Sequence, residues 1–72
     1  MIKITPREKQ IAKLAAQGKN NREIAEILKP VAITTIKNHI HSLILKTNSS
    51  NRTGAIVRLL NEGIITTDKL SN

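Results

Sequence analysis

The sequence predicts an all-α fold, a compact four-helix domain that takes up residues 1–72 as a single unit. Three observations support this prediction. Apolar residues recur at helical spacing in four successive segments, polar breaks with glycine, proline, asparagine or serine separate these segments, and no useful stretch alternates between apolar and polar residues as a strand would. A chain of 72 residues is long enough for one small domain and too short for two.

The first helix is expected over residues 6–17. Thr5 is suited to be its N-cap, Pro6 to occupy the first helical position, and Glu8 to complete a capping box. An apolar stripe at i, i+3 and i+4 follows, and Gly18 can end the helix in a left-handed conformation. Local signals therefore define both ends of this helix.

The second helix is expected to be short, over residues 21–28. Asn20 can cap it, and Glu23 stands where a second capping box needs an acid. Pro30 stops this helix, because the residue before a proline is pushed out of the helical region.

The third helix is expected over residues 33–46. Its core stripe recurs at i, i+4, i+7 and i+8 and consists of Ile36, Ile40, Leu43 and Ile44. At about 100° per residue, the opposite side forms an outer face made of Thr34, Lys37, Asn38, His41 and Leu45. This outer face is either an ordinary solvated surface or a set of hydrogen-bonding groups for a ligand.

The fourth helix is expected over residues 51–62, with Ser50 or Asn51 as its cap and Gly63 as its stop. Its apolar residues can close the core, meet a second copy of the chain, or do both. The candidates for a dimer interface are Ile56, Val57 and Leu60.

The short second helix, the tight turn and the longer third helix together have the pattern of a helix-turn-helix. In that motif the second helix of the pair enters the major groove of DNA. Lysine can donate hydrogen bonds to guanine O6 and N7, and asparagine can form two hydrogen bonds with adenine. The outer face of the third helix therefore carries groups suited to base edges.

The chain carries 12 Lys and Arg against 5 Asp and Glu, a formal charge of +7. This excess favours a polyanionic partner, with nucleic acid first and an anionic membrane surface second, and a basic domain without such a partner is the alternative. No apolar run approaches the ~18 residues of a membrane span, and the N-terminus lacks the apolar stretch of a secretory signal. We therefore expect a cytoplasmic protein that does not use a membrane.

Cysteine and aromatic residues are both absent, which excludes disulfides, thiolate metal sites and aromatic platforms for single-stranded nucleic acids. His39 and His41 point to different sides of a helix and lack an obvious third ligand, so we expect no metal site. The serines have no neighbouring His–acid arrangement, and no Gly-rich phosphate loop is present. We expect no cofactor and no enzymatic activity.

Several short motifs match one known family in order and nearly in spacing. They are ITPRE at 4–8, AQG at 16–18, NREIA at 21–25, TIKNHI at 35–40 and NRT at 51–53. Together they resemble the LuxR-type (GerE-type) helix-turn-helix domain, and the resemblance covers residues 4 to about 62. Each motif alone is weak, but the set in register is specific.

The resemblance implies a four-helix domain that binds a two-fold double-stranded DNA site as a homodimer. The third helix would lie in the major groove and the fourth would supply the dimer contact. Lys37, Asn38 and His41 fall at the base-contacting positions of the family. The resemblance also implies phosphate contacts at Thr34, Thr35, Arg52 and Thr53, and the further candidates are Lys46 and Arg7.

The sequence departs from the family pattern in three places. The turn before the third helix is one residue longer, with Val31 available for its apolar position. Ala32 and Ile33 replace the usual Ser cap and acid, so we expect an exposed Ile33 and a cap that is missing or moved to Thr34. Residues 47–49 replace a usual Leu-Gly-Val, which is expected to trim the core under the fourth helix.

The preferred hypothesis is a sequence-specific DNA-binding transcription regulator that works as a homodimer. The alternative is a protein-interaction module that pairs with a larger regulator of the same family and modulates it without reading DNA. A promoter-binding module of the sigma-factor type, which would contact RNA polymerase, is a third hypothesis. The chain is either a stand-alone effector or a piece of a longer regulator.

Overall fold

The computed structural model describes residues 2–66, so Met1 and residues 67–72 of the expected single domain lie outside the described residues. The helices are α1 (Pro6–Ala16), α2 (Asn21–Ile27), α3 (Ile33–Lys46) and α4 (Arg52–Asn61). No strand occurs within residues 2–66. The predicted all-α, four-helix fold is confirmed, and the helix bounds differ from the predicted ones by no more than one residue at any end.

The predicted capping boxes form at the starts of α1 and α2. The Thr5 hydroxyl accepts a hydrogen bond from the Glu8 N–H at 3.1 Å, and the Glu8 carboxylate accepts one from the Thr5 N–H at 2.8 Å. Asn20 and Glu23 make the same exchange at 2.8 and 2.9 Å. Asn51, one of the two predicted caps, caps α4. These caps satisfy backbone N–H groups that a helix start leaves without intrahelical partners.

Three helices end in the same left-handed turn. The residue after the C-cap has a positive φ in each case, +89° at Gly18, +55° at Asn48 and +73° at Gly63. The next N–H reaches back to the helix, as from Ser49 to the Ile44 carbonyl at 3.0 Å, which is the Schellman pattern. The predicted stops at the two glycines are confirmed, and Asn48 takes the same conformation without being glycine.

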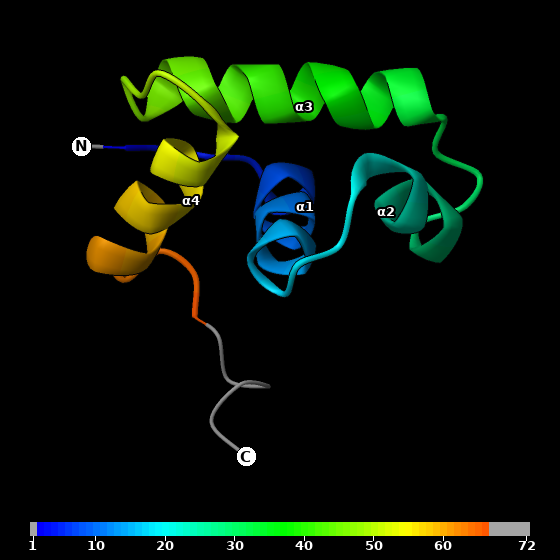
Figure 1. The fold of residues 1–72 in the computed structure, drawn as a ribbon, viewed down its shortest axis with the longest axis horizontal. Helices are drawn as coiled ribbons and strands as arrows, with labels where there is room; N and C mark the ends of the chain where they lie inside the picture. The colour runs from blue at the N-terminus through cyan, green and yellow to red at the C-terminus, as the bar shows by residue number, and fades with distance from the viewer. Residues whose placement is uncertain (1, 67–72) are drawn as a thin grey trace.

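Helix α3 lies across the other three helices, with α1 between α2 and α4 (Figure 1). It contacts all three of them. The buried apolar residues line the sides on which the helices meet, and they are Ile11, Ala12, Ile24, Ile36, Ile40, Leu43, Ala55, Leu59 and Ile65. This arrangement leaves one long side of α3 directed away from the rest of the domain.

Thr47, the C-cap of α3, is a buried polar residue at one of the positions where the sequence departs from the predicted family pattern. Only 1% of Thr47 is exposed. Its hydroxyl lies 2.8 Å from the Leu43 carbonyl, to which it donates, and 2.7 Å from the Ser49 hydroxyl. A buried hydroxyl is costly without a partner, so these bonds let a polar residue fill a position in the core.

Candidate nucleic-acid interface

The outer face of α3 is exposed to solvent. Lys37, Asn38 and His41 are all exposed. They lie within about one third of the helix circumference at ~100° per residue. The remaining members of the outer face, Thr34 and Leu45, are exposed as well. The structure therefore brings the three predicted base-contacting residues together on one accessible surface.

Helix α3 carries no acidic residue from Ile33 to Lys46. Its N-cap, Ala32, makes no side-chain hydrogen bond. The expected loss of the cap is therefore confirmed, and the alternative of a cap at Thr34 is wrong, because Thr34 lies inside the helix. The helix therefore has a partly positive N-terminus and an outer face that carries Lys37 and no acid, and both features suit a polyanion.

Two expectations about the turn before α3 have opposite outcomes. Val31 is half-buried and packs against the core, as predicted for the apolar turn position. Ile33 is half-buried, so the prediction that it is exposed is wrong. The Ile33 side chain lies at about 60° from that of the buried Ile36 around the helix axis, so it is at the margin of the core rather than on the outer face.

Among residues 2–66, no group of three or more His, Cys, Asp and Glu side chains is arranged to hold a metal ion. His39 is half-buried and His41 is exposed, on different sides of α3. No helix of the described residues is long and apolar enough to span a bilayer.

Comparison with known proteins assigns the family. Residues 3–59 match the family model described as bacterial regulatory proteins, luxR family. The chain belongs to the luxR family. This assignment confirms the predicted LuxR-type helix-turn-helix domain, a domain class found in transcriptional regulators.

A solved structure described as the transcription factor GerE resembles this luxR-family domain closely. The TM-score is 0.85 at 34% sequence identity, over 90% of this chain and 96% of that chain. The fold is therefore GerE-like across nearly the whole length of both molecules.

Curated relatives are regulators by name. The quorum-sensing-dependent transcriptional regulator VjbR of Brucella ovis is 44% identical over 62 residues, which are 86% of this chain and 24% of VjbR. The transcriptional regulatory protein DesR of Bacillus subtilis is 38% identical over 60 residues, 83% of this chain and 30% of DesR. The luxR-family chain thus spans about a quarter to a third of the length of these relatives.

Arg52, one of the predicted phosphate contacts, makes hydrogen bonds between helices of the domain. Its guanidinium donates to the Asn21 side chain and to the Lys19 carbonyl, the latter at 2.8 Å. These bonds join the start of α4 to the start of α2, two helices that flank α1. Local sequence patterns do not reveal this role, because Asn21 and Arg52 are 31 residues apart.

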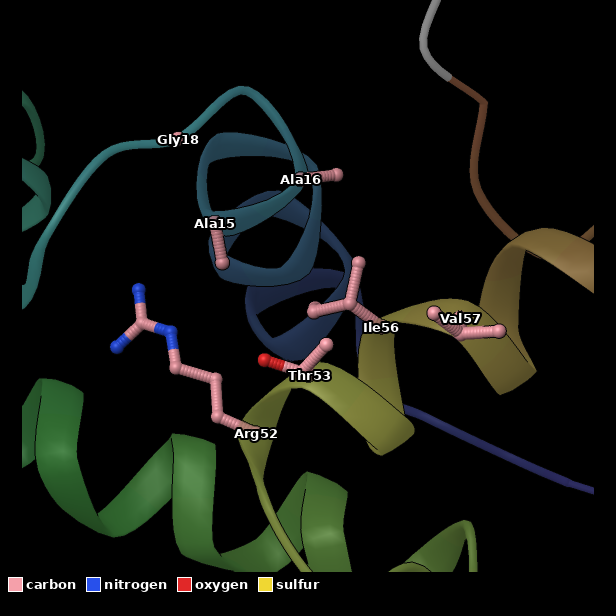
Figure 2. Close-up of a pocket in the computed structure, with 7 residues that line it drawn as sticks. All are labelled: Ala15, Ala16, Gly18, Arg52, Thr53, Ile56 and Val57. Atoms are coloured by element: carbon pink, nitrogen blue, oxygen red, sulfur yellow. The ribbon is translucent and has the colours of Figure 1, made fainter.

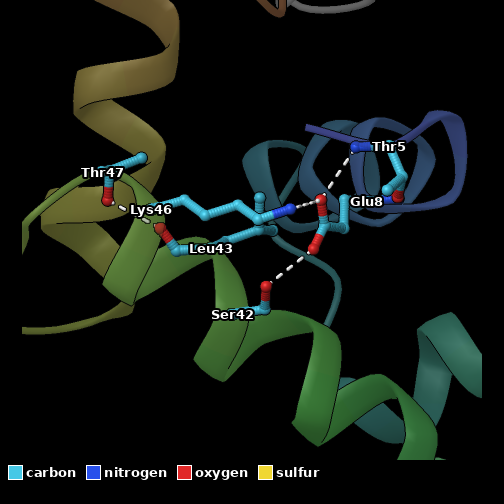
Figure 3. A network of polar contacts seen from close by, with 6 residues as sticks. All are labelled: Thr5, Glu8, Ser42, Leu43, Lys46 and Thr47. Atoms are coloured by element: carbon cyan, nitrogen blue, oxygen red, sulfur yellow. Dashed lines mark hydrogen bonds and ion pairs between the residues drawn. The ribbon is translucent and has the colours of Figure 1, made fainter. Parts of the chain in front are cut away.

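Lys46, another predicted phosphate contact, is paired with an acid. Its ammonium lies 2.8 Å from Glu8 Oε1, and the Ser42 hydroxyl donates to Glu8 Oε2 at 2.8 Å (Figure 3). Burial alone would raise the pKa of Glu8, but hydrogen bonds from Lys46, the Thr5 N–H and Ser42 outweigh it and lower the pKa to about 2. The sequence identified Glu8 only as a capping residue.

The other predicted phosphate contacts, Arg7, Thr35 and Thr53, are exposed. Thr53 borders a pocket of about 200 Å³ between the end of α1 and the start of α4 (Figure 2). Two of the predicted dimer residues, Ile56 and Val57, line the same pocket. Val57 is 48% exposed, whereas Ile56 and Leu60 are half-buried against the core, and the three stay candidates for a dimer contact.

Proposed function

We propose that this luxR-family domain reads a specific sequence in double-stranded DNA and thereby regulates transcription. The observation that carries the proposal is the exposed, acid-free outer face of α3, on which Lys37, Asn38 and His41 stand together. An α-helix fits the major groove, where lysine and asparagine recognise guanine and adenine edges. In this proposal the protein acts in the cytoplasm, and it needs neither a cofactor nor a catalytic reaction.

Affinity in this proposal comes from the positive charge of the chain. A formal charge of +7 favours release of counterions from the phosphate backbone, which makes binding depend on salt. Thr34 and Thr35 are exposed at the first turn of α3, and threonine hydroxyls are suited to phosphate oxygens beside the groove. Phosphate contacts position the domain, and base contacts select the sequence.

The test uses a duplex site selected from random DNA and two variants of the outer face. We expect Lys37→Ala and His41→Ala each to weaken binding to the selected site by about tenfold or more, because each loses a base contact. Lys13→Ala is the control, since Lys13 is exposed on α1 and its loss changes the net charge as Lys37→Ala does. If both outer-face variants bind as tightly as the wild type, α3 does not read DNA.

The proposed DNA-bound form is a homodimer that pairs through α4. The support is Val57, a large apolar residue that is 48% exposed beside Ile56 at the pocket. We expect Val57→Glu to change the stoichiometry on the selected site from two chains per duplex to one, as measured by sedimentation. Two chains per duplex in the variant would exclude Val57 from the contact.

The same apolar residue on α4 supports the second candidate, a module that pairs with a larger luxR-family regulator without reading DNA. An exposed Ile33 would also have favoured this candidate, but Ile33 is half-buried. Salt-sensitive DNA binding by the isolated chain at moderate ionic strength would rule it out.

A further inference from the structure

Glu8 is the charged residue that the fold buries most completely within residues 2–66, with 3% of it exposed. Its two carboxylate oxygens are both engaged. Oε1 accepts from the Thr5 N–H and from the Lys46 ammonium, each at 2.8 Å, and Oε2 accepts from the Ser42 hydroxyl at 2.8 Å. The carboxylate therefore joins the first turn of α1 to the C-terminal half of α3 (Figure 3).

The hydrogen bonds between Glu8 and α3 differ in kind from the apolar packing that holds the rest of the helix. Ile36, Ile40 and Leu43 are buried in an aliphatic core. Hydrophobic burial is not directional, so such a core resists separation of the helices more strongly than rotation of one of them. Hydrogen bonds weaken steeply away from their preferred angles. The bonds to Glu8 therefore restrain the rotation of α3 about its own axis.

The restrained side of α3 borders its outer face. Ser42 follows His41 directly and lies one turn after Asn38. Lys46 lies one further turn along, so Glu8 binds two successive turns of the helix. A functional group must be held within ~0.5 Å and about 10–20° to act well, and the rotation of α3 sets where the outer face points.

We propose that Glu8 is a positioning residue for DNA recognition, whose carboxylate fixes the rotation of α3 and so directs the outer face at the bases. This inference rests on the proposed function. It also assigns the Lys46 ammonium to Glu8 rather than to a phosphate. A simple charge argument predicts the opposite effect on affinity, because removal of a negative charge should strengthen binding to DNA.

The experiment compares Glu8→Gln with Glu23→Gln. Each acid closes a capping box, and each change removes one negative charge. Glu23 differs from Glu8 because it is exposed and its capping hydrogen bonds are made with Asn20 alone. Affinities for the selected duplex and for a scrambled duplex are measured on the full chain, at a temperature at which circular dichroism shows every variant folded. The ratio of the two affinities reports selectivity and is independent of a uniform charge effect.

We expect Glu8→Gln to lower this ratio by about tenfold, a loss comparable to that of one mismatched base pair. Glu23→Gln should change it less than about twofold, as expected for an exposed site. Ser42→Ala removes one bond to Glu8 and should lower the ratio by about threefold, which keeps the test open if Glu8→Gln does not fold. Folded Glu8→Gln or Ser42→Ala with the selectivity of Glu23→Gln would overturn the proposal.

The result also separates this inference from the proposed function. If the wild type does not distinguish the two duplexes, the proposed function fails. The positioning role is then judged on the free protein by the amide resonances of Lys37, Asn38 and His41. Shifts of these resonances in Glu8→Gln but not in Glu23→Gln support the role, and their absence overturns it.

Discussion

The ionised carboxylate of Glu8 links the stability of the domain to pH. Its pKa is lowered from 4.5 to about 2 in the folded protein, so folding favours the charged form. The stabilisation is therefore fully present above the unfolded pKa of 4.5 and is lost as the pH falls through about 2. A shift of this size corresponds to roughly 3 kcal/mol.

We expect the free energy of unfolding of the wild type to fall as the pH is lowered from about 5 to about 2, and that of Glu8→Gln to fall less by up to ~3 kcal/mol. Denaturant titration at several pH values measures this difference. Glu23→Gln serves as the exposed control. Parallel profiles for the wild type and Glu8→Gln would contradict the assigned ionisation.

Asn48 ends α3 with a φ of +55°, a conformation in which glycine is not strained. We expect Asn48→Gly to stabilise the domain by about 0.5 kcal/mol, because the relief of strain exceeds the added entropy of the unfolded chain. The reciprocal change Gly18→Ala should cost ~1 kcal/mol, since Gly18 has a φ of +89° although an added Cβ would meet nothing within 4 Å. Thermal unfolding measures both, and a loss of stability in Asn48→Gly would contradict the expectation.

At the scale of helices, α3 lacks a cap that the other three helices have. Ala32 offers no side-chain acceptor to the first turn of α3. We expect Ala32→Ser to stabilise the domain by about 1 kcal/mol and Asn51→Ala to destabilise it by a similar amount, because Asn51 caps α4. Denaturant midpoints test both changes. An unchanged midpoint for Ala32→Ser would show that the N-terminus of α3 cannot use a cap.

The helices follow signals that the sequence displays locally. The capping boxes at Thr5 and Asn20 and the stop at Gly63 each depend on residues a few positions apart, so the elements and the exposed side of α3 were predictable. The contacts of Arg52 and Glu8 join residues 31 and 38 positions apart. Such contacts depend on how the helices pack, which local patterns do not specify.

For the molecule as a whole, the arrangement of four helices explains how one small domain leaves a long helix face exposed. Helix α3 rests on α1, α2 and α4, which leaves its outer face accessible (Figure 1). The apolar residues of the core that supports it are all aliphatic, because the chain has no aromatic residue. In the proposed function, the charge of +7 supplies long-range attraction to DNA, and the outer face supplies the choice of sequence.

The central claim, that α3 reads DNA in a paired domain, is tested most directly by selection of binding sites from random duplex DNA with the wild-type chain. We expect a two-fold symmetric sequence whose half-sites lie about one helical turn apart, because two copies that pair through α4 would present two α3 helices to successive major grooves. Failure of the folded chain to enrich any sequence above the random pool at moderate salt would contradict the claim.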